Sequence, residues 1–395
     1  MLTRIFLSTM FFLSSAIVAQ IPVTQLPLVY QIPEMNKVEI KKGIVYKTVN
    51  DTALSLDVYY PASFDKKSKL PVVIFNNGVG SLDLLNWRVY ADWAKLIAAN
   101  GLIAINYQSR QGRTFQDSED LLAYVRSHAV ELSIDGERIG LWTCSANVTV
   151  GLPLMMQPER TYIRSGVIYY GSAQLQTMRT DFPVLYVRSG LDAANINTGI
   201  EHTVRHMTEV ECDLTFIHYS EGQHAFDIVD DNDRSRQIIR QTIDFFVYNL
   251  KKPSPVMRPL TAKRFKTLIE QGDTTKAFQE YRGFLKYIQS AGTYHPFFTW
   301  ALNENGLIGI AYQLLQNKKN KEALTIFLIN TGIHPESPNA FDSLADAYEA
   351  DGQNELAVRT AQKALDLLAK ATNLNENFKR GIQTSAEDKI KRLKK

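Results

Sequence analysis

The chain has 395 residues, of which 45% are hydrophobic and 22% are charged. This composition is ordinary for globular proteins, and the length exceeds that of one common domain, so we expect two domains. The net charge of +3 is too small, and the Lys and Arg residues too dispersed, for a nucleic-acid-binding protein. We therefore expect no nucleic-acid partner.

The N-terminal segment carries a basic residue, an apolar run and then small residues. Arg4 precedes the apolar run, and the small residues end at Ala19. This order is typical of a secretory signal peptide, and we predict that residues 1–19 are removed. The run is too short to span a bilayer comfortably, so we expect no integral membrane segment after cleavage. The mature protein is predicted to be secreted or periplasmic.

Residues 20–252 are predicted to form an α/β domain. Short β-rich runs alternate with helical patterns such as that of residues 86–100. The first two runs alternate polar and apolar residues, as an exposed antiparallel edge would, while the later ones are continuously apolar, as in parallel strands buried on both faces. The pattern indicates a doubly wound, mostly parallel sheet. The runs span residues 37–49, 54–60, 70–75, 101–107, 138–142, 166–170, 182–188 and 212–219.

Residues 253–262 are predicted to be a linker, because the three prolines of this region forbid a continuing helix. Residues 263–395 show helical patterns only, and one apolar pattern recurs after 34 residues, the period of a tetratricopeptide helix pair. Leu307, Ile310, Ala311, Leu314, Ala323 and Phe327 recur as Phe341, Leu344, Ala345, Tyr348, Ala357 and Ala361. We predict a smaller all-α domain that resembles tetratricopeptide repeats.

Ser145 lies where the predicted strand 138–142 gives way to a helical pattern. Hydrolases often carry Gly-x-Ser-x-Gly at such a turn, because the sharp bend lifts the serine hydroxyl above the end of the sheet. Here the two glycine positions hold Thr143 and Asn147. Ser145 is therefore a candidate nucleophile, and a helix N-cap is the alternative. The sequence leaves open whether Thr143 and Asn147 permit full activity.

Asp192 and His224 follow two later predicted strands, 182–188 and 212–219. Active sites of parallel sheets gather in such loops, and the chain order serine, aspartate, histidine is that of α/β-hydrolases. We predict that His224 is the base for Ser145 and that Asp192 orients the imidazole. Each could instead be an ordinary loop residue. Other carboxylates lie close in sequence, namely Asp181, Asp227, Asp230 and Asp231.

The loop after the predicted strand 70–75 reads Asn77-Gly78-Val79-Gly80. It stands where such hydrolases carry a His-Gly-Gly-Gly-like run, whose backbone amides bind an oxyanion. We predict that the amides of Val79 and Ala146 form this oxyanion hole.

These segments resemble the α/β-hydrolase superfamily, and specifically its dienelactone-hydrolase-like or small-esterase branch. The likeness covers about residues 35–250 and rests on the segments "NNGVG", "ERIGLWTCSAN", "SGLD" and "GQHAFD". The resemblance implies an α/β-hydrolase fold and ester hydrolysis. Dienelactone hydrolases use a cysteine nucleophile, which makes Cys144 a minor alternative to Ser145.

The predicted function is that of a secreted serine hydrolase that cleaves carboxylic esters, with amides as a second class, through an acyl-enzyme. We expect a small-molecule ester substrate, whose acyl and alcohol groups the sequence does not indicate. We expect no metal and no organic cofactor. Glu201, His202 and His206 share a helix face, which we interpret as a solvated surface.

The alternative is a catalytically degenerate hydrolase scaffold, a reading that Asn147 favours. The helical repeat domain would then do the main work by holding a protein or peptide partner in its groove.

Overall fold

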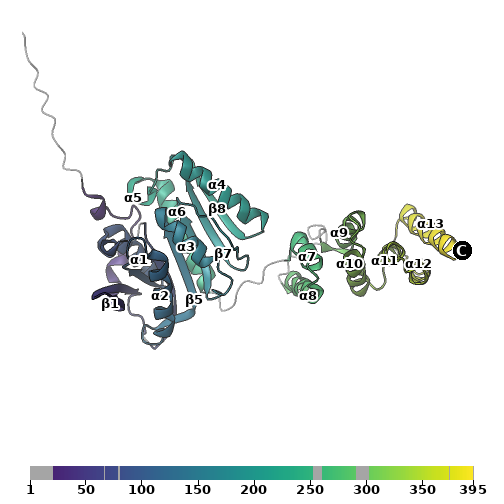
Figure 1. Ribbon diagram of the computed structural model, residues 1–395, viewed down its shortest axis with the longest axis horizontal. Helices are drawn as coiled ribbons and strands as arrows, with labels where there is room; N and C mark the ends of the chain where they lie inside the picture. Colours follow the sequence, from purple (N-terminus) through teal and green to yellow (C-terminus); the bar gives the residue numbers. More distant parts are fainter. Residues whose placement is uncertain are drawn as a thin grey trace, which may run out of the picture. The chain divides into compact units, whose positions relative to one another are not determined.

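The chain divides into two compact units, residues 1–255 and residues 256–395. We call them the first unit and the helical unit. Figure 1 shows helices packed on a sheet in the first unit and helices only in the second. The computed structural model describes residues 21–65, 67–78, 81–251, 260–290, 302–372 and 374–394. The predicted signal peptide and most of the predicted linker lie outside the described residues.

An eight-stranded sheet forms the centre of the first unit, with the strand order β1-β2-β4-β3-β5-β6-β7-β8. β2 is antiparallel to both β1 and β4, and every pairing from β4 to β8 is parallel. The strands are β1 (Glu39–Val49), β2 (Thr52–Tyr60), β3 (Leu70–Asn76), β4 (Ile103–Tyr107), β5 (Ile134–Cys144), β6 (Ile163–Tyr169), β7 (Pro183–Ser189) and β8 (Asp213–Tyr219).

Helices cover both faces of this sheet. Side chains of α2, α3 and α4 join one apolar cluster, and those of α1, α5 and α6 join another. In β3, Val72 and Ile74 belong to the first cluster while Val73 and Phe75 belong to the second, because successive side chains of a strand point to opposite faces. The helices are α1 (Arg88–Ala99), α2 (Thr114–Ser127), α3 (Val148–Met155), α4 (Ala194–Glu209), α5 (Phe226–Val229) and α6 (Asp233–Leu250).

The helical unit is built of consecutive helices whose buried side chains form two apolar clusters of its own. α9 and α10 begin at Glu304 and Asn320, and α11 and α12 begin at Pro338 and Asn354, so both helices recur at the offset read from the sequence. Small residues at four of the repeating positions are fully buried: Ala311, Ala323, Ala345 and Ala357. The helices are α7 (Ala262–Glu270), α8 (Thr274–Ser290), α9 (Glu304–Gln316), α10 (Asn320–Ile333), α11 (Pro338–Ala350), α12 (Asn354–Leu368) and α13 (Glu376–Leu393).

The predicted fold class is confirmed: a doubly wound, mostly parallel α/β-hydrolase sheet is accompanied by a smaller all-helical unit. Within the described ranges, no helix combines the length and the apolar character that crossing a bilayer requires.

The connection from β6 to β7, residues 170–182, contains no helix. Parallel strands are usually joined by a crossover helix, so another interaction has to hold this segment in place. Arg179, a buried side chain, provides it by donating hydrogen bonds to the carbonyl oxygens of Met155, Arg160 and Ile163. It also forms an ion pair with Asp181.

Replacing Arg179 by Met should lower the free energy of unfolding of the first unit by about 1–3 kcal/mol, because buried carbonyl oxygens lose their donors. Urea unfolding followed by tryptophan fluorescence measures this loss. Arg236→Met is the matched control. Among the described residues, Arg236 pairs with the exposed Asp231 and Asp233, so this variant should change stability by at most about 1 kcal/mol. Equal urea midpoints for the two variants would contradict this role of Arg179.

Candidate functional site

Ser145 sits at a sharp bend between β5 and α3. β5 ends at Cys144, a single 3₁₀ turn covers Ser145–Asn147, and α3 follows at Val148. Ser145 has a φ of 53°, in the left-handed region that non-glycine residues rarely adopt. Strained backbone of this kind is common at active sites. In a nucleophile elbow it presents the hydroxyl above the carboxyl end of the central strand.

The structure brings the predicted nucleophile, base and carboxylate together. The Ser145 Oγ lies 2.9 Å from the His224 Nε2, and the His224 Nδ1 lies 2.7 Å from the Asp192 Oδ2. A carboxylate only accepts hydrogen bonds, so Asp192 holds the proton on Nδ1 and leaves Nε2 able to accept one from Ser145. The Asp192 side chain is 3% exposed and that of His224 is 38% exposed, so the base is open to a substrate while its partner is shielded.

The loops that carry Asp192 and His224 are hydrogen-bonded to each other. They follow β7 and β8, which pair in parallel up to Ser189 and Tyr219. The pairing continues beyond the strands, where the Gly190 amide donates to the Tyr219 carbonyl at 2.7 Å and the Leu191 amide to the Gly222 carbonyl at 2.9 Å. The distance from carboxylate to imidazole is therefore set by backbone contacts.

Thr143 occupies the first glycine position of the elbow because a glycine on the neighbouring helix makes room for it. A Cβ added to Gly151 of α3 would lie 2.5 Å from the Thr143 Oγ1 and 2.6 Å from its Cβ. Real Cβ atoms do not approach other atoms so closely. In the usual elbow, the glycine on the strand side leaves room for the helix. Here Gly151 on the helix leaves the room that the Thr143 side chain needs.

Asn147, at the second glycine position, bonds to the loop after β3. Its backbone amide donates to the Gly78 carbonyl at 2.8 Å, and its side-chain amide donates to the Asn77 carbonyl. Its own carbonyl accepts from the Thr143 hydroxyl at 2.9 Å. The two residues that replace glycine are therefore bonded to each other, and Asn147 fastens the elbow to the predicted oxyanion loop. The sequence alone left open whether Asn147 permits full activity.

Of the two predicted oxyanion donors, only one lies in the described part of the chain. Ala146 stands directly after Ser145 in the 3₁₀ turn and is exposed. Val79 and Gly80 lie outside the described residues. The neighbouring Gly78 amide already donates to the Cys144 Sγ at 3.2 Å, so it is not available to a substrate oxygen.

Cys144, the alternative nucleophile, is buried beneath the elbow. Burial raises the pKa of its thiol well above the ordinary value, and the neighbouring Asp227 carboxyl raises it further. The reactive form of cysteine is the thiolate, so this thiol is poorly suited to nucleophilic attack. Within the described residues, Cys144 and Cys212 are not joined by a disulfide.

Two residues behind the imidazole were not singled out from the sequence as part of the site. Tyr170 lies against His224, with ring centroids 4.8 Å apart, and donates its hydroxyl to the Asp227 carboxyl at 2.8 Å. Asp227 also accepts from the Trp93 indole at 2.8 Å, and its burial raises its pKa. Asp227 therefore holds the Tyr170 ring that lies against His224, while Asp192 contacts the imidazole itself. The "YY" at the end of the strand run 166–170 was the available signal for Tyr170.

Among the residues that the structure describes, no group of three or more His, Cys, Asp and Glu side chains is arranged to hold a metal ion.

Comparison with known proteins finds no matching protein-family model and no match among curated proteins. Solved structures of Thermogutta terrifontis esterase 2 do match. Its apo form is 17% identical, with a TM-score of 0.45 over 56% of this chain and 98% of that one. Its paraoxon-phosphorylated form is 18% identical, with a TM-score of 0.44 over 55% and 96% of the two chains. The propionate-bound form is 18% identical, with a TM-score of 0.43 over 56% and 98%. These values are too low to say what this chain does, so the inference has to come from its own residues.

The contact between Gly151 and Thr143 predicts a specific pattern of stability. Gly151→Ala should destabilise the first unit by about 1–3 kcal/mol through overpacking, although alanine is the better helix former. Thr143→Gly should reverse part of this loss in the double variant, giving a coupling of about 1 kcal/mol in a double-mutant cycle. Urea unfolding followed by tryptophan fluorescence measures each arm.

Gly309→Ala provides the control, because a Cβ at Gly309 of α9 meets nothing within 4 Å. This variant should leave the helical unit equally or more stable, as followed by far-ultraviolet ellipticity. Strict additivity of Gly151→Ala and Thr143→Gly would show that the two sites do not compensate for each other.

Proposed function

We propose that the first unit is a serine hydrolase that cleaves carboxylic esters, with amides as a second substrate class, through an acyl-enzyme. The observation that carries this proposal is the continuous hydrogen-bonded chain from Asp192 through His224 to Ser145. A serine hydroxyl is a weak nucleophile until a base accepts its proton, and this arrangement supplies the base and its orienting carboxylate.

In the proposed reaction the Ser145 Oγ attacks the ester carbonyl carbon while the His224 Nε2 takes the hydroxyl proton. The tetrahedral intermediate collapses, and the alcohol leaves with the proton that His224 returns. Water then attacks the acyl-enzyme with His224 again as base, which releases the acid and restores Ser145. Asp192 stabilises the imidazolium in both halves of the reaction.

The carbonyl oxygen becomes negatively charged in the intermediate and needs donors. We assign this role to the backbone amide of Ala146 and, beyond the described residues, to that of Val79. Each such donor is worth roughly 10²–10³-fold in kcat. The bonds of Asn147 to the Asn77 and Gly78 carbonyls support the proposal, because they tie the loop that precedes Val79 to the elbow.

We further propose that residues 1–19 direct the chain to a secreted or periplasmic location and that residues 253–262 link the two domains. For the helical unit we propose a tetratricopeptide-like role, the binding of a protein or peptide partner. The recurrence of α9 and α10 as α11 and α12 supports this. The dienelactone-hydrolase-like or small-esterase branch remains our proposal for the ancestry of the first unit.

Reaction with a fluorophosphonate probe tests the nucleophile. The wild-type protein should be labelled covalently, and Ser145→Ala should not be labelled. Cys144→Ala is the matched control and should retain labelling, because it alters the neighbouring residue and leaves the hydroxyl in place. A folded wild-type protein that stays unlabelled would favour the scaffold function, in which the helical unit binds the partner.

Asp192→Asn should lower kcat by about 10⁴-fold because the imidazole tautomer is no longer fixed.

Asn147→Ala tests the connection between the elbow and the oxyanion loop. This substitution removes the side-chain donor to the Asn77 carbonyl but keeps the backbone bond to Gly78. It should lower kcat by about 10-fold or more with KM little changed, because a small displacement of a donor weakens transition-state binding. Steady-state kinetics on p-nitrophenyl acetate measures both constants, and the urea midpoint checks folding. A rise in KM with kcat unchanged would contradict this positioning role.

A further inference from the structure

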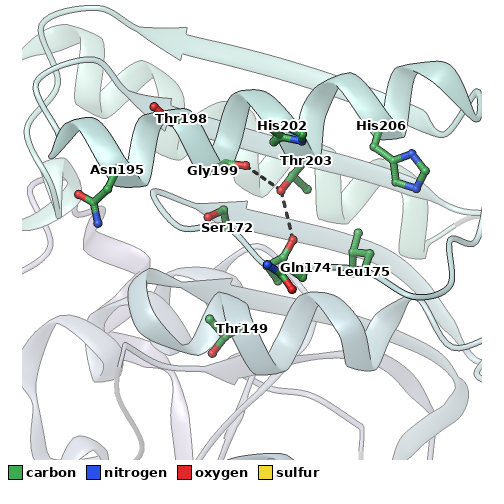
Figure 2. Close-up of a pocket in the computed structure, with 11 residues that line it drawn as sticks. Thr149, Ser172, Gln174, Leu175, Asn195, Thr198, Gly199, His202, Thr203 and His206 are labelled. Carbon is green, nitrogen blue, oxygen red and sulfur yellow. Dashed lines mark hydrogen bonds between the residues drawn. The ribbon is translucent and has the colours of Figure 1, made fainter.

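A groove of about 700 Å³ runs between α3 and α4, over the connection from β6 to β7. Figure 2 shows Thr149 on α3 at one side, Asn195, Thr198 and His202 on α4 at the other, and Ser172 on the segment between them. The groove exists because residues 170–182 cross the sheet without a helix. Its volume falls in the range of about 300–1,000 Å³ that is typical of small-molecule sites.

The groove begins beside the nucleophile. The Thr149 hydroxyl donates to the carbonyl of Ala146, the residue after Ser145, at 2.7 Å. Gly171, which leads into the groove floor, packs so closely against the Ser145 carbonyl that a Cβ would collide with it. Asn195 lies in the first turn of α4, shortly after Asp192. A substrate attached to Ser145 therefore has the groove as a neighbouring space.

The lining combines apolar surface with uncharged hydroxyl and carboxamide groups and two histidines. Among its described lining residues there is no Asp, Glu, Lys or Arg, and the polar groups are hydroxyls, carboxamides and imidazoles. Within the described part of the chain, the side chains of Ser172, Gln174 and Asn195 make no hydrogen bond to another residue. An anionic ligand would find no Lys or Arg side chain among these lining residues, and a long acyl chain would cover the polar side chains without giving them partners.

We propose that this groove binds the alcohol portion of the ester, and that this portion is a neutral oligosaccharide. The inference rests on the proposed esterase function and specifies its substrate class. Sugar hydroxyls both donate and accept, so they match hydroxyls and carboxamides that do the same. Leu175 and the threonine methyl groups offer apolar surface to the C–H faces of a sugar ring. A sugar enters an ester through its hydroxyl oxygen, which places it on the leaving side of the reaction.

Binding to the full-length Ser145→Ala protein tests the groove without turnover. Isothermal titration with cellotetraose, xylotetraose and maltotetraose should show binding of at least one of them. Thr198→Leu should weaken that binding about tenfold by placing an apolar side chain in the groove. Thr208→Leu is the matched control, since Thr208 also lies on α4 and bonds to the carbonyl four residues earlier, but does not line the groove.

Kinetics on the Ser145-containing protein supplies the second arm. Thr198→Leu should raise KM for an acetylated form of the bound tetrasaccharide about tenfold, whereas the control Thr208→Leu, outside the groove, should leave this KM unchanged. The groove proposal would be overturned if none of the tetrasaccharides binds. It would also be overturned if tetra-alanine amide, a peptide, binds instead, or if the enzyme prefers p-nitrophenyl octanoate, an ester with a long acyl chain. A wild-type protein that the fluorophosphonate does not label would overturn the esterase proposal separately, because sugar binding to Ser145→Ala needs no reaction.

Discussion

The bend at Ser145 constrains the structure around it more than any other feature. With a φ of 53°, the chain passes from β5 to α3 within one 3₁₀ turn, and such backbone persists only where the surroundings hold it. Contacts from several elements do so here. Asn147 bonds to the loop after β3, Gly151 leaves room for Thr143, and Gly171, after β6, packs against the Ser145 carbonyl. Thr143 and Asn147, which stand where hydrolases often carry glycine, thus help to fix the bend.

The second fixed part of the site is the pair of loops after β7 and β8. Backbone hydrogen bonds from Gly190 and Leu191 join them beyond the ends of the strands, so Asp192 and His224 keep their separation as a unit. Tyr170 then limits the tilt of the imidazole from behind, and Asp227 holds the tyrosine hydroxyl. The alignment of His224 with Ser145 therefore depends on two rigid parts, the bend at Ser145 and the paired loops after β7 and β8, which meet at the carboxyl ends of the strands.

Sequence reasoning reached those features that local pattern determines. Continuous apolar runs located the parallel strands, and the position of Ser145, Asp192 and His224 directly after three of them was enough to predict their meeting. Asp192 was selected over Asp227 from the sequence, but the contacts of Asp227 were not predictable: it accepts from the Tyr170 hydroxyl, whereas Asp192 accepts from His224. The compensation of Thr143 by Gly151 was also beyond the reach of the sequence, since it depends on how α3 packs on β5. The bonds of Asn147 could not be predicted from the sequence, because its partners come from a loop some seventy residues earlier. His202 and His206 are exposed, as expected, yet both line the groove.

In the proposed esterase, the connection between β6 and β7, which contains no helix, separates the reacting groups from the groove. The reacting groups stand on loops tied to the sheet and to each other, whereas the groove is lined by α3, α4 and the segment that Arg179 anchors. A change on the outer part of α4, as at Thr198, alters the groove without touching a hydrogen bond of Asp192, His224 or Ser145. Because a short anchored segment leaves space where a helix would fill it, variation in this connection would alter the groove of the proposed esterase and leave its reacting groups unchanged. The buried Arg179 adds hydrogen bonds with carbonyl oxygens to the apolar contacts that this segment makes through residues such as Leu175 and Met178, and so helps to keep the floor of the groove in place.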